Sequence, residues 1–306
     1  FNPTNINQKA INEFNDLITN EHIETIKNFD DDDYDIIGVH GQTIYHNPLK
    51  YISMQIINPQ IISNYFKKKV VCNFRKNDIK NNGQGAPIAP IYHKFLIEKL
   101  NLNLPSCIIN IGGISNITYW DGKTLIGFDC GPGNTLMDKT IQKYLKQDYD
   151  NQGNIAARGE IKYLYVNHIL KDPFFKQNYP KSLDSKYFDK YLNKVYQNIP
   201  LIEDLMSTLL NLTVLSIKDG IEKLPKKIKS IVVTGGGANN LELIKKIKNF
   251  IQIPVVETEM DKNFIESELI SYISARTLND LPITFPKTTG VKTPLTGGEL
   301  YEPKIL

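Results

Sequence analysis

Glycine-rich segments that directly follow apolar, strand-like runs constrain the fold of this chain more than any other feature. Three of them are NIGGISN at 110–116, DCGPGN at 129–134 and TGGGANN at 234–240. Helical spacing of apolar residues follows the second and third, and strands that alternate with helices are typical of an α/β fold. Because open α/β sheets bind ligands beyond the carboxyl ends of their strands, we expect these turns to meet in one cleft between two lobes.

Apolar periodicity predicts the elements around these turns. Helices are predicted over 7–28, 91–100, 134–146, 202–217, 241–247 and 265–273, and strands at 34–39, 70–74, 231–233 and 255–256. The strand-like runs 107–120 and 124–129 flank Asp121-Gly122, a pair typical of hairpin turns. Residues 148–195 form an irregular insertion with short helices in this interpretation.

Length and composition exclude several classes of protein. The chain has 306 residues, which suits two domains, and 41% hydrophobic with 23% charged residues excludes a disordered chain. No apolar run approaches the roughly 20 residues of a membrane helix. The net charge is only +3, and with three arginines (Arg75, Arg158 and Arg276) the basic charge is mostly scattered lysine. This pattern does not favour a nucleic-acid partner.

The cysteines indicate the compartment. Cys72, Cys107 and Cys130 stand far apart in apolar runs and form no C-x-x-C pair, which predicts reduced, buried thiols rather than a metal site. No secretory signal opens the chain. We therefore expect a cytoplasmic protein. Because the chain does not begin with methionine, we also expect its start to reflect processing or truncation.

Two of the glycine segments are candidate ligand loops. In 110–116 the glycines allow close backbone approach and expose N–H groups, and Ser115 and Asn116 would add side-chain donors. The alternative is a β-bulge or tight bend without a ligand. The segment 234–240 joins a strand to a helix, where a phosphate or a flat nucleobase can bind. It matches neither G-x-G-x-x-G nor a Walker loop.

The segment 129–134 carries the candidate catalytic group. We expect Asp129 to end a buried strand, with Gly-Pro-Gly stopping the sheet and Asn134 capping the next helix. A carboxylate at a strand end beside a cleft is well placed as a general base, and we favour this role over an aspartate that ties down a turn. Asp138, one turn into the helix, is expected to complement the helix dipole.

Polar residues also follow the strands of the first half. His40, Gln42 and Thr43 come after one strand and Arg75 after another, and Arg75 could clamp a carboxylate with two hydrogen bonds. A lone histidine after a strand more often has a structural role, so the role of His40 stays open.

Taken together, these segments resemble the anhydro-N-acetylmuramic acid kinase family over nearly the whole chain. The motifs that carry the resemblance are GVHGQTIYHNP at 38–48, NFRKNDIKNNGQGAP at 73–87, NIGGISNIT at 110–118, GFDCGPGNTLMD at 127–138, TGGGANN at 234–240 and TTGV at 288–291. The resemblance implies a two-lobed actin-like, RNase H-like ATPase fold of the sugar-kinase type, with ATP and Mg²⁺ in the interdomain cleft. The first lobe would comprise 1–104 and 263–306, and the second 105–262 with the insertion at 148–195.

The resemblance also implies a reaction. Water would attack the anomeric carbon of 1,6-anhydro-N-acetylmuramic acid while O6 takes the γ-phosphoryl group of ATP. The product would be N-acetylmuramic acid 6-phosphate, in peptidoglycan recycling.

Residue roles follow from the resemblance position by position. Asp129 matches the aspartate that deprotonates the water, and Glu266 matches a carboxylate that assists it. The phosphate loop corresponds to Gly112 and Gly113, with Ser115 and Asn116 as further nucleotide-binding residues, and the adenosine-side turn to Gly235, Gly236, Gly237 and Asn239. The segments that approach the sugar contain His40, Gln42, Thr43, Arg75, Gly131 and Pro132. No residue is assigned as a metal ligand.

The chain departs from the family pattern at two places. Lys181-Ser182-Leu183-Asp184 replaces a Lys-Ser-Thr-Gly-Arg-like run, which leaves the local contacts of the insertion open. The family opens with a loop resembling M-S-G-T-S-x-D-G-x-D that holds the β- and γ-phosphates. The sequence of this chain contains no segment that matches that loop. We therefore expect an N-terminally incomplete first lobe.

Two alternatives to an active kinase stay open. One is a shortened family member that binds sugar without phosphoryl transfer, and the other is an actin-like assembly protein. Asp129 beside an intact Gly-Pro-Gly-Asn turn argues against the second alternative, because filaments do not need a cleft carboxylate. The expected partners are a small amino sugar and ATP, with neither nucleic acid nor membrane. The sequence does not indicate an oligomeric state, and a homodimer is the commonest assembly of soluble oligomers in general.

Overall fold

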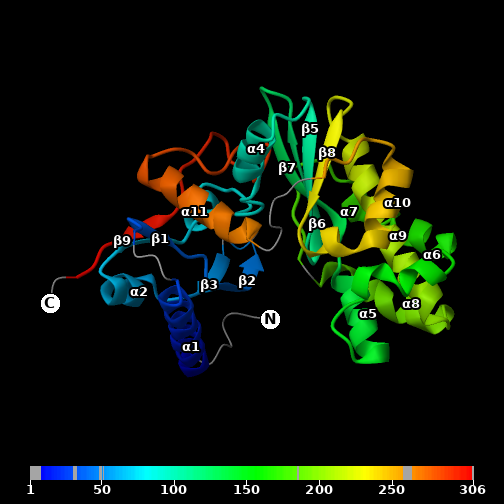
Figure 1. Cartoon of the computed structure of the whole chain (residues 1–306), viewed down its shortest axis with the longest axis horizontal. Coiled ribbons are helices and arrows are strands. Elements are labelled where there is room, and N and C mark those ends of the chain that lie inside the picture. Colours follow the sequence, from blue (N-terminus) through cyan, green and yellow to red (C-terminus); the bar gives the residue numbers. More distant parts are fainter. Residues whose placement is uncertain are drawn as a thin grey trace. The chain divides into compact units, whose positions relative to one another are not determined.

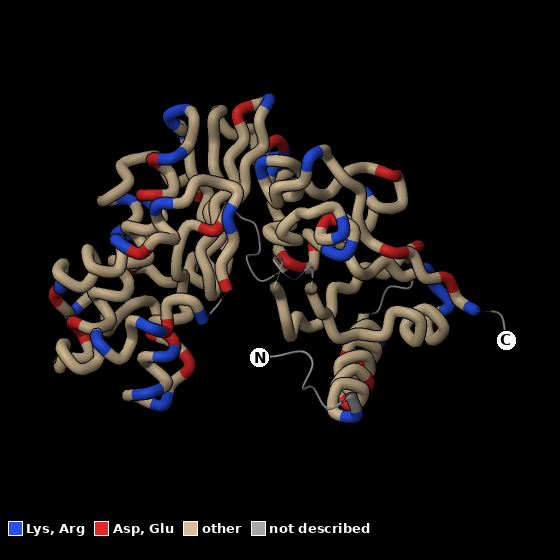
Figure 2. Tube along the Cα trace, turned by 180° about the vertical axis from the view of Figure 1, so that it is seen from behind, with Lys and Arg blue, Asp and Glu red and all other residues tan. Residues whose placement is uncertain are grey.

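The computed structural model describes residues 8–29, 33–47, 50, 52–184, 186–257 and 264–304. The chain forms two compact units, one of Phe1–Ile88 with Glu266–Leu306 and one of Ala89–Ile265. The expected mixed α/β fold with two parts is confirmed. Figure 2 shows Lys and Arg interspersed with Asp and Glu along the described trace of each unit. Among the described residues, no helix has the length and apolar character needed to cross a membrane.

The first unit combines elements from both ends of the chain (Figure 1). Its elements are α1 (Gln8–Lys27), β1 (Ile36–Gly38), β2 (Gln42–Asn47), β3 (Ile52–Ile56), α2 (Pro59–Phe66), β4 (Lys69–Cys72), α3 (Lys76–Lys80), α11 (Ile265–Leu278) and β9 (Glu299–Tyr301). The strands β1 and β4 are parallel, and β9 joins β4 in the antiparallel sense.

Local signals explain several first-unit elements. The predicted helix 7–28 is confirmed as α1, and Ile23 on its inner face joins the core with Ile37 of β1 and Val70 of β4. The helix α2 begins with two standard signals: the Asn58 side chain accepts a hydrogen bond from the Ile61 N–H, and Pro59 follows directly. The sequence patterns did not predict α2, β9 or the β2–β3 hairpin. β2 (QTIYHN) has no clear apolar alternation, whereas β3 (ISMQI) alternates over only five residues.

The second unit is built on a four-stranded sheet in the order β7-β6-β5-β8 (Figure 1). Its elements, in which η denotes a 3₁₀ helix, are α4 (Pro90–Lys99), β5 (Ser106–Ile111), β6 (Ile114–Trp120), β7 (Leu125–Pro132), α5 (Thr135–Leu145), η3 (Asn151–Gly153), η4 (Ala156–Arg158), α6 (Tyr163–Ile169), α7 (Pro173–Lys176), η5 (Tyr187–Tyr191), α8 (Leu192–Asn198), α9 (Ile202–Glu222), β8 (Ser230–Thr234), η6 (Gly236–Asn239) and α10 (Leu241–Ile251). The predicted hairpin at Asp121-Gly122 is confirmed as the β6–β7 connection.

The structure differs from two of the strand predictions. The run 107–120 is not one strand, because the Gly112-Gly113 turn divides it into the antiparallel strands β5 and β6. The predicted strand at 255–256 is a single bridge, in which Val255 pairs with Ile231.

The first boundary between the units falls after residue 88 rather than after 104. The reason is that α4 packs on the sheet of the second unit. The buried His93 ring of α4 makes a 2.7 Å hydrogen bond to the Thr118 hydroxyl of β6, and the Lys94 ammonium lies 4.4 Å from the Trp120 ring centroid. Neighbouring β6 side chains point to opposite faces, so α4 covers one face while α9, which approaches Ile117, covers the other.

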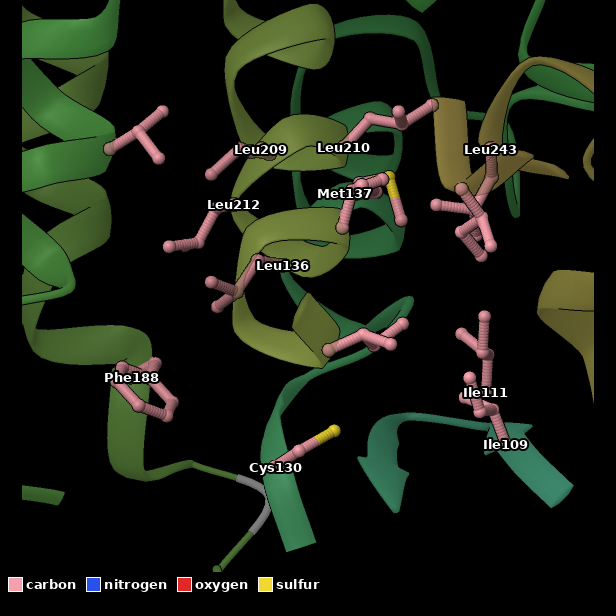
Figure 3. Close-up of a cluster of buried hydrophobic side chains, with 14 of the residues drawn as sticks. Ile109, Ile111, Cys130, Leu136, Met137, Phe188, Leu209, Leu210, Leu212 and Leu243 are labelled. Atoms are coloured by element: carbon pink, nitrogen blue, oxygen red, sulfur yellow. The ribbon is translucent and has the colours of Figure 1, made fainter. Parts of the chain in front are cut away.

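The main core lies between the sheet and the helices of the second unit. Figure 3 shows Leu136 and Met137 of α5, Leu209 and Leu210 of α9 and Ile109 of β5 in one apolar cluster. The helix α9 is more deeply buried than the amphipathic pattern predicts, because side chains on most of its circumference contact other elements. The expected free, buried thiols are confirmed at all three cysteines.

The buried Asp172 carboxylate connects several segments of the insertion at 148–195. Asp172 accepts hydrogen bonds from the hydroxyl groups of Tyr187 and Tyr191 and pairs with the Lys190 ammonium at 2.7 Å. These tyrosines lie in a cluster of aromatic rings with Phe174 and Phe188. The predicted short helices are confirmed. A second buried carboxylate, Asp150, accepts the N–H groups of Ile155 and Ala156 at the start of η4.

Candidate functional site

The turn at Gly112-Gly113 fixes the start of α5. The Gly112 carbonyl accepts the Asn134 N–H at 2.8 Å, and the Gly113 carbonyl accepts the Gly133 N–H at 2.9 Å and the Thr135 hydroxyl at 2.9 Å. Asn134 stands at the N-cap position, but its side chain donates to the Ile111 carbonyl instead of capping the helix. The prediction of a side-chain cap was wrong, because Asn134 has helical φ and ψ of −80° and −23° rather than the extended backbone of a typical N-cap residue.

The second glycine segment packs tightly on β5. Gly235 has a φ of +78°, and a Cβ atom on it would lie 2.3 Å from the Asn110 side-chain oxygen. A Cβ atom on Gly237 would lie 2.5 Å from Ile111. Gly236 is different, because its nearest neighbour would be the Asn134 amide at 3.7 Å. Two of the three glycines therefore serve packing, and the third leaves space open.

A pocket of about 350 Å³ opens where this segment approaches the start of α5. Its walls are Asn134, Met137, Asp138, Tyr149, Asp150, Asn151, Gln152, Gly236, Asn239 and Asn240. Two of the predicted nucleotide-binding residues, Gly236 and Asn239, thus lie in one pocket. Burial raises the pKa of Asp138 to about 6. We had expected Asp138 only to complement the helix dipole, and its place one turn after Asn134 was the signal that it shares this wall.

Asp129 lies inside β7 and not at its end. The strand continues through Gly131 and Pro132, which pair with Ser115 and Ile114 of β6. The expectation that Gly-Pro-Gly stops the sheet was wrong, because β7 is one of the two edge strands of this sheet and an edge strand tolerates proline. Asp129 is 8% exposed.

The insertion holds Asp129 through backbone groups. The Asp129 N–H donates to the Lys181 carbonyl at 3.0 Å, and the Leu183 N–H donates to Asp129 Oδ2 at 2.7 Å. The Lys181–Asp184 run, which departs from the family pattern, is therefore the segment that contacts the candidate base. The sequence carried no signal for this contact.

The remaining candidate residues of the second unit, Ser115, Asn116 and Gly131, lie within the sheet or against α9. Ser115 is fully buried, and its hydroxyl donates to the Pro132 carbonyl at 3.4 Å rather than to an open surface. Asn116 is half-buried and lies in register between Asn110 and Asp129. A Cβ atom on Gly131 would lie 2.5 Å from Ser216 of α9, so this glycine permits the close approach of the helix.

In the first unit, His40 follows β1 with both ring nitrogens buried. Neither nitrogen has a hydrogen-bond partner within the described part of the chain. Burial and, to a smaller extent, the nearby Arg75 guanidinium lower the pKa of His40 to about 4. The ring is therefore neutral at pH 7 and can offer one donor and one acceptor to a ligand.

The β2–β3 hairpin carries a row of polar side chains. The Gln55 amide donates to the Thr43 hydroxyl at 3.3 Å and to the Ser53 hydroxyl at 2.7 Å. The His46 ring makes a 3.1 Å hydrogen bond to the same Ser53 hydroxyl, while Gln42 is exposed at the start of β2. Ser53 and Gln55 were not predicted as candidates, because β3 itself was missed.

Asp78 joins two of the motifs. Its buried carboxylate accepts the Gly85 N–H at 2.6 Å and the Thr289 hydroxyl at 2.5 Å, and the Thr289 carbonyl accepts the Gln84 N–H at 2.7 Å. The motif segments 73–87 and 288–291 therefore meet in the first unit. Asp78 acts there as a structural tie that holds the Gln84-Gly85 loop.

Glu266 lies in the first turn of α11, where its side chain is exposed. It belongs to the first unit and Asp129 to the second, so their cooperation remains a prediction. Across the described residues, no three His, Cys, Asp or Glu side chains gather as a metal site would require.

Comparison with known proteins shows which family this chain is similar to. A family model for "Anhydro-N-acetylmuramic acid kinase" matches residues 4–303. The anhydro-N-acetylmuramic acid kinase of Rhodopseudomonas palustris (strain BisB18) is 35% identical, over 96% of this chain and 82% of that protein. The one of Pelagibacter ubique (strain HTCC1062) is 39% identical, over 97% of this chain and 82% of that protein. A ligand-bound xylulose kinase from Lactobacillus acidophilus is 14% identical, over 69% of this chain and 46% of that one, with a TM-score of 0.39.

The α/β fold and the kinase-named relatives define the class: the chain is a carbohydrate kinase. More narrowly, it belongs to the anhydro-N-acetylmuramic acid kinase family, as the resemblance of its motifs implied.

Proposed function

We propose that this kinase opens 1,6-anhydro-N-acetylmuramic acid with water and phosphorylates its O6, with ATP as the phosphoryl donor. Family membership supports the substrate class. The observation that carries the proposal is the Asp129 carboxylate, which is buried in β7 and held at Oδ2 by the Leu183 N–H. A buried carboxylate in a fixed orientation is suited to accept a proton from water.

The proposed reaction has one balanced sequence of bond changes. Asp129 takes a proton from water, and the water oxygen forms the new bond to the anomeric carbon C1. The bond between C1 and O6 breaks, and O6 forms a bond to the γ-phosphorus of ATP as ADP leaves. Glu266 assists Asp129 in this proposal. Phosphoryl transfer depends mainly on positioning and charge stabilisation, so one base and a set of backbone loops suffice on the protein side.

The pocket beside Gly236 is the proposed site for the adenosine part of ATP. Its walls combine the polar side chains of Asn134 and Asn239 with the open face of Gly236, which suits a flat base. The Gly112-Gly113 turn borders the start of α5 and would approach the phosphates. Ser115 would support that turn from within the sheet, and Asn116 would add a half-buried amide.

Mg²⁺ fits this proposal as an ion that arrives with the nucleotide. Mg²⁺ keeps several waters and usually binds one or two carboxylates together with substrate phosphates, so a preformed set of three protein ligands is not required. When bound, it would neutralise charge on the phosphates.

The sugar is proposed to contact residues of the first unit. Its carboxylate suits the Arg75 guanidinium, and its hydroxyl groups suit the neutral His40 ring. Gln42 and Thr43 would add side-chain hydrogen bonds, and Gly131 and Pro132 of the second unit would approach the sugar with their backbone. The product would enter peptidoglycan recycling in the cytoplasm, a compartment with which three free, buried cysteines agree.

The test is Asp129→Asn in the full-length enzyme. The amide cannot accept the proton, so kcat should fall by at least about 10²-fold, while ATP binding measured by calorimetry should persist. Glu266→Gln, assayed in parallel, should give a smaller loss because its role is auxiliary. Near-normal turnover of the Asp129 variant would remove Asp129 as the base.

A further inference from the structure

The insertion contacts β7 at several residues, including a stacked pair of the Phe128 and Tyr179 rings, and two of its backbone hydrogen bonds go to Asp129. Asp129 donates its N–H to the Lys181 carbonyl at 3.0 Å and accepts the Leu183 N–H at its side-chain Oδ2 at 2.7 Å. The insertion therefore forms hydrogen bonds to both the backbone N–H and the carboxylate of Asp129. A carboxylate oxygen held at 2.7 Å by a rigid amide loses rotational freedom about its side-chain bonds.

Lys181 anchors this segment. Its side chain is 3% exposed, its ammonium donates to the Phe174 carbonyl at 3.2 Å, and the same atom lies 4.0 Å from the Phe174 ring centroid. A buried ammonium is costly unless hydrogen bonds and rings replace its water, so these contacts define where Lys181 can sit. Because Leu183 is only two residues from Lys181, these contacts restrict where its amide can lie, as does the packing of the Leu183 side chain against the main core.

We propose that the Leu183 amide, held in place by Lys181, is the positioning group that orients the Asp129 carboxylate and favours its ionised form. The inference rests on the proposed function, in which Asp129 takes the proton from water. A hydrogen bond donated to the charged form of a carboxyl group stabilises that form. The donor at 183 is a backbone N–H, so the contact does not depend on the side chain at 183, where the chain departs from its family's pattern.

Other charged groups also surround Asp129, and the test must hold them constant. The Lys181 ammonium interacts with Asp129 and also with Asp219 of α9, and Asp219 pairs at 2.6 Å with Lys223 at the C-cap of that helix. Cys130 lies next in β7, and burial raises the pKa of its thiol, so it is uncharged. Changing only the amide at 183 leaves all four groups in place.

The first test follows the Leu183 amide directly, by NMR of full-length protein labelled with ¹⁵N-leucine. The amide proton resonance should move with pH as Asp129 titrates, and this movement should vanish in Asp129→Asn. A resonance that does not move with pH, or that moves equally in Asp129→Asn, would overturn the proposal. This measurement needs no catalytic activity and no variant at 183.

The second test compares Leu183→Pro, which removes the amide hydrogen, with Leu183→Ala, which keeps it. Relative to Leu183→Ala, the proline variant should show about tenfold lower kcat, the scale of one hydrogen bond to a charged group. The acid limb of its kcat–pH profile should move up by about one pH unit. The KM for ATP should be the same in both variants.

The outcomes separate the inference from the proposed function. Equal kcat and equal acid limbs in the two variants would overturn the positioning role while Asp129→Asn still abolishes turnover. Near-normal turnover of Asp129→Asn would instead remove the proposed base. If Leu183→Pro does not fold, the NMR titration decides the inference alone.

Discussion

Two titratable side chains, Asp138 and His40, lie in surroundings that disfavour their charged forms. Burial is the main cause in each case: it raises the pKa of Asp138 to about 6 and lowers the pKa of His40 to about 4. Groups of this kind cost folding free energy and are concentrated at ligand sites. Asp138 lines the pocket proposed for adenosine, and His40 lies among the residues proposed for the sugar.

The Asp138 carboxyl predicts a pH-dependent effect on stability. Its pKa in the folded protein lies above the ordinary value of 3.8, so the fold is favoured while the group is protonated and loses stability as pH rises from about 4 to about 6. Asp138→Asn should therefore be more stable than the parent at pH 7, on the order of 1 kcal/mol because the half-exposed group is partly screened. The gain should disappear near pH 4.

Urea unfolding at both pH values checks this prediction. Asp148→Asn, at an exposed position, is the control and should change stability little at either pH. Equal stability of Asp138→Asn and the parent protein at pH 7 would contradict the expected burial cost.

Glycines set the junctions between elements of the second unit. Gly235 and Gly237 bring η6 onto β5, and Gly131 lets α9 approach β7. Gly236 contributes no such contact, although it lies between two glycines that do. The same three-glycine run therefore contains packing positions and one position on the pocket wall.

This difference predicts that two alanine substitutions affect different properties: one lowers stability and the other weakens ATP binding. Gly235→Ala adds a Cβ atom 2.3 Å from the Asn110 side-chain oxygen at a positive φ, so it should destabilise the protein by at least about 1–3 kcal/mol. Gly236→Ala should leave the free energy of unfolding nearly unchanged and weaken ATP binding, because the methyl group enters the pocket. Denaturant unfolding and calorimetric titration with ATP measure the two effects. Similar destabilisation by both substitutions would refute this division of roles.

At the scale of the whole molecule, the first unit is completed by segments from opposite ends of the chain. β9 pairs with β4, and the Thr289 hydroxyl reaches the buried Asp78 carboxylate. Asp78 in turn holds the Gly85 amide, so residues near the C-terminal end determine the shape of a loop formed by residues 84–87.

Removing the Thr289 hydroxyl should loosen this loop. Thr289→Val keeps the shape of the side chain but leaves one buried Asp78 oxygen without its donor, which should cost about 1–3 kcal/mol of unfolding free energy. Thr293→Val, at an exposed position nearby, should be almost neutral. Thermal unfolding of both variants and hydrogen exchange at Gly85 provide the measurement. Unchanged exchange at Gly85 in Thr289→Val would show that the tie does not hold the loop.

Much of the fold could be predicted from local patterns. The periodicity of α1, α5 and α10 is carried within each segment, and the Asp-Gly turn between β6 and β7 is a local signal. Short pieces such as β9 were missed because three residues carry no periodicity, and they become strands only through their partners. The extension of β7 through Pro132 was missed because it depends on the strand being at an edge.

The sequence by itself determined the family, the glycine positions and the identity of the candidate base, because motifs and turn chemistry are properties of neighbouring residues. Only the tertiary structure decided which groups surround that base. Leu183 reaches Asp129 across 54 residues, and Thr289 reaches Asp78 across 211. Such contacts arise when packing brings distant backbone and side-chain groups within hydrogen-bond distance, and no local pattern encodes that approach.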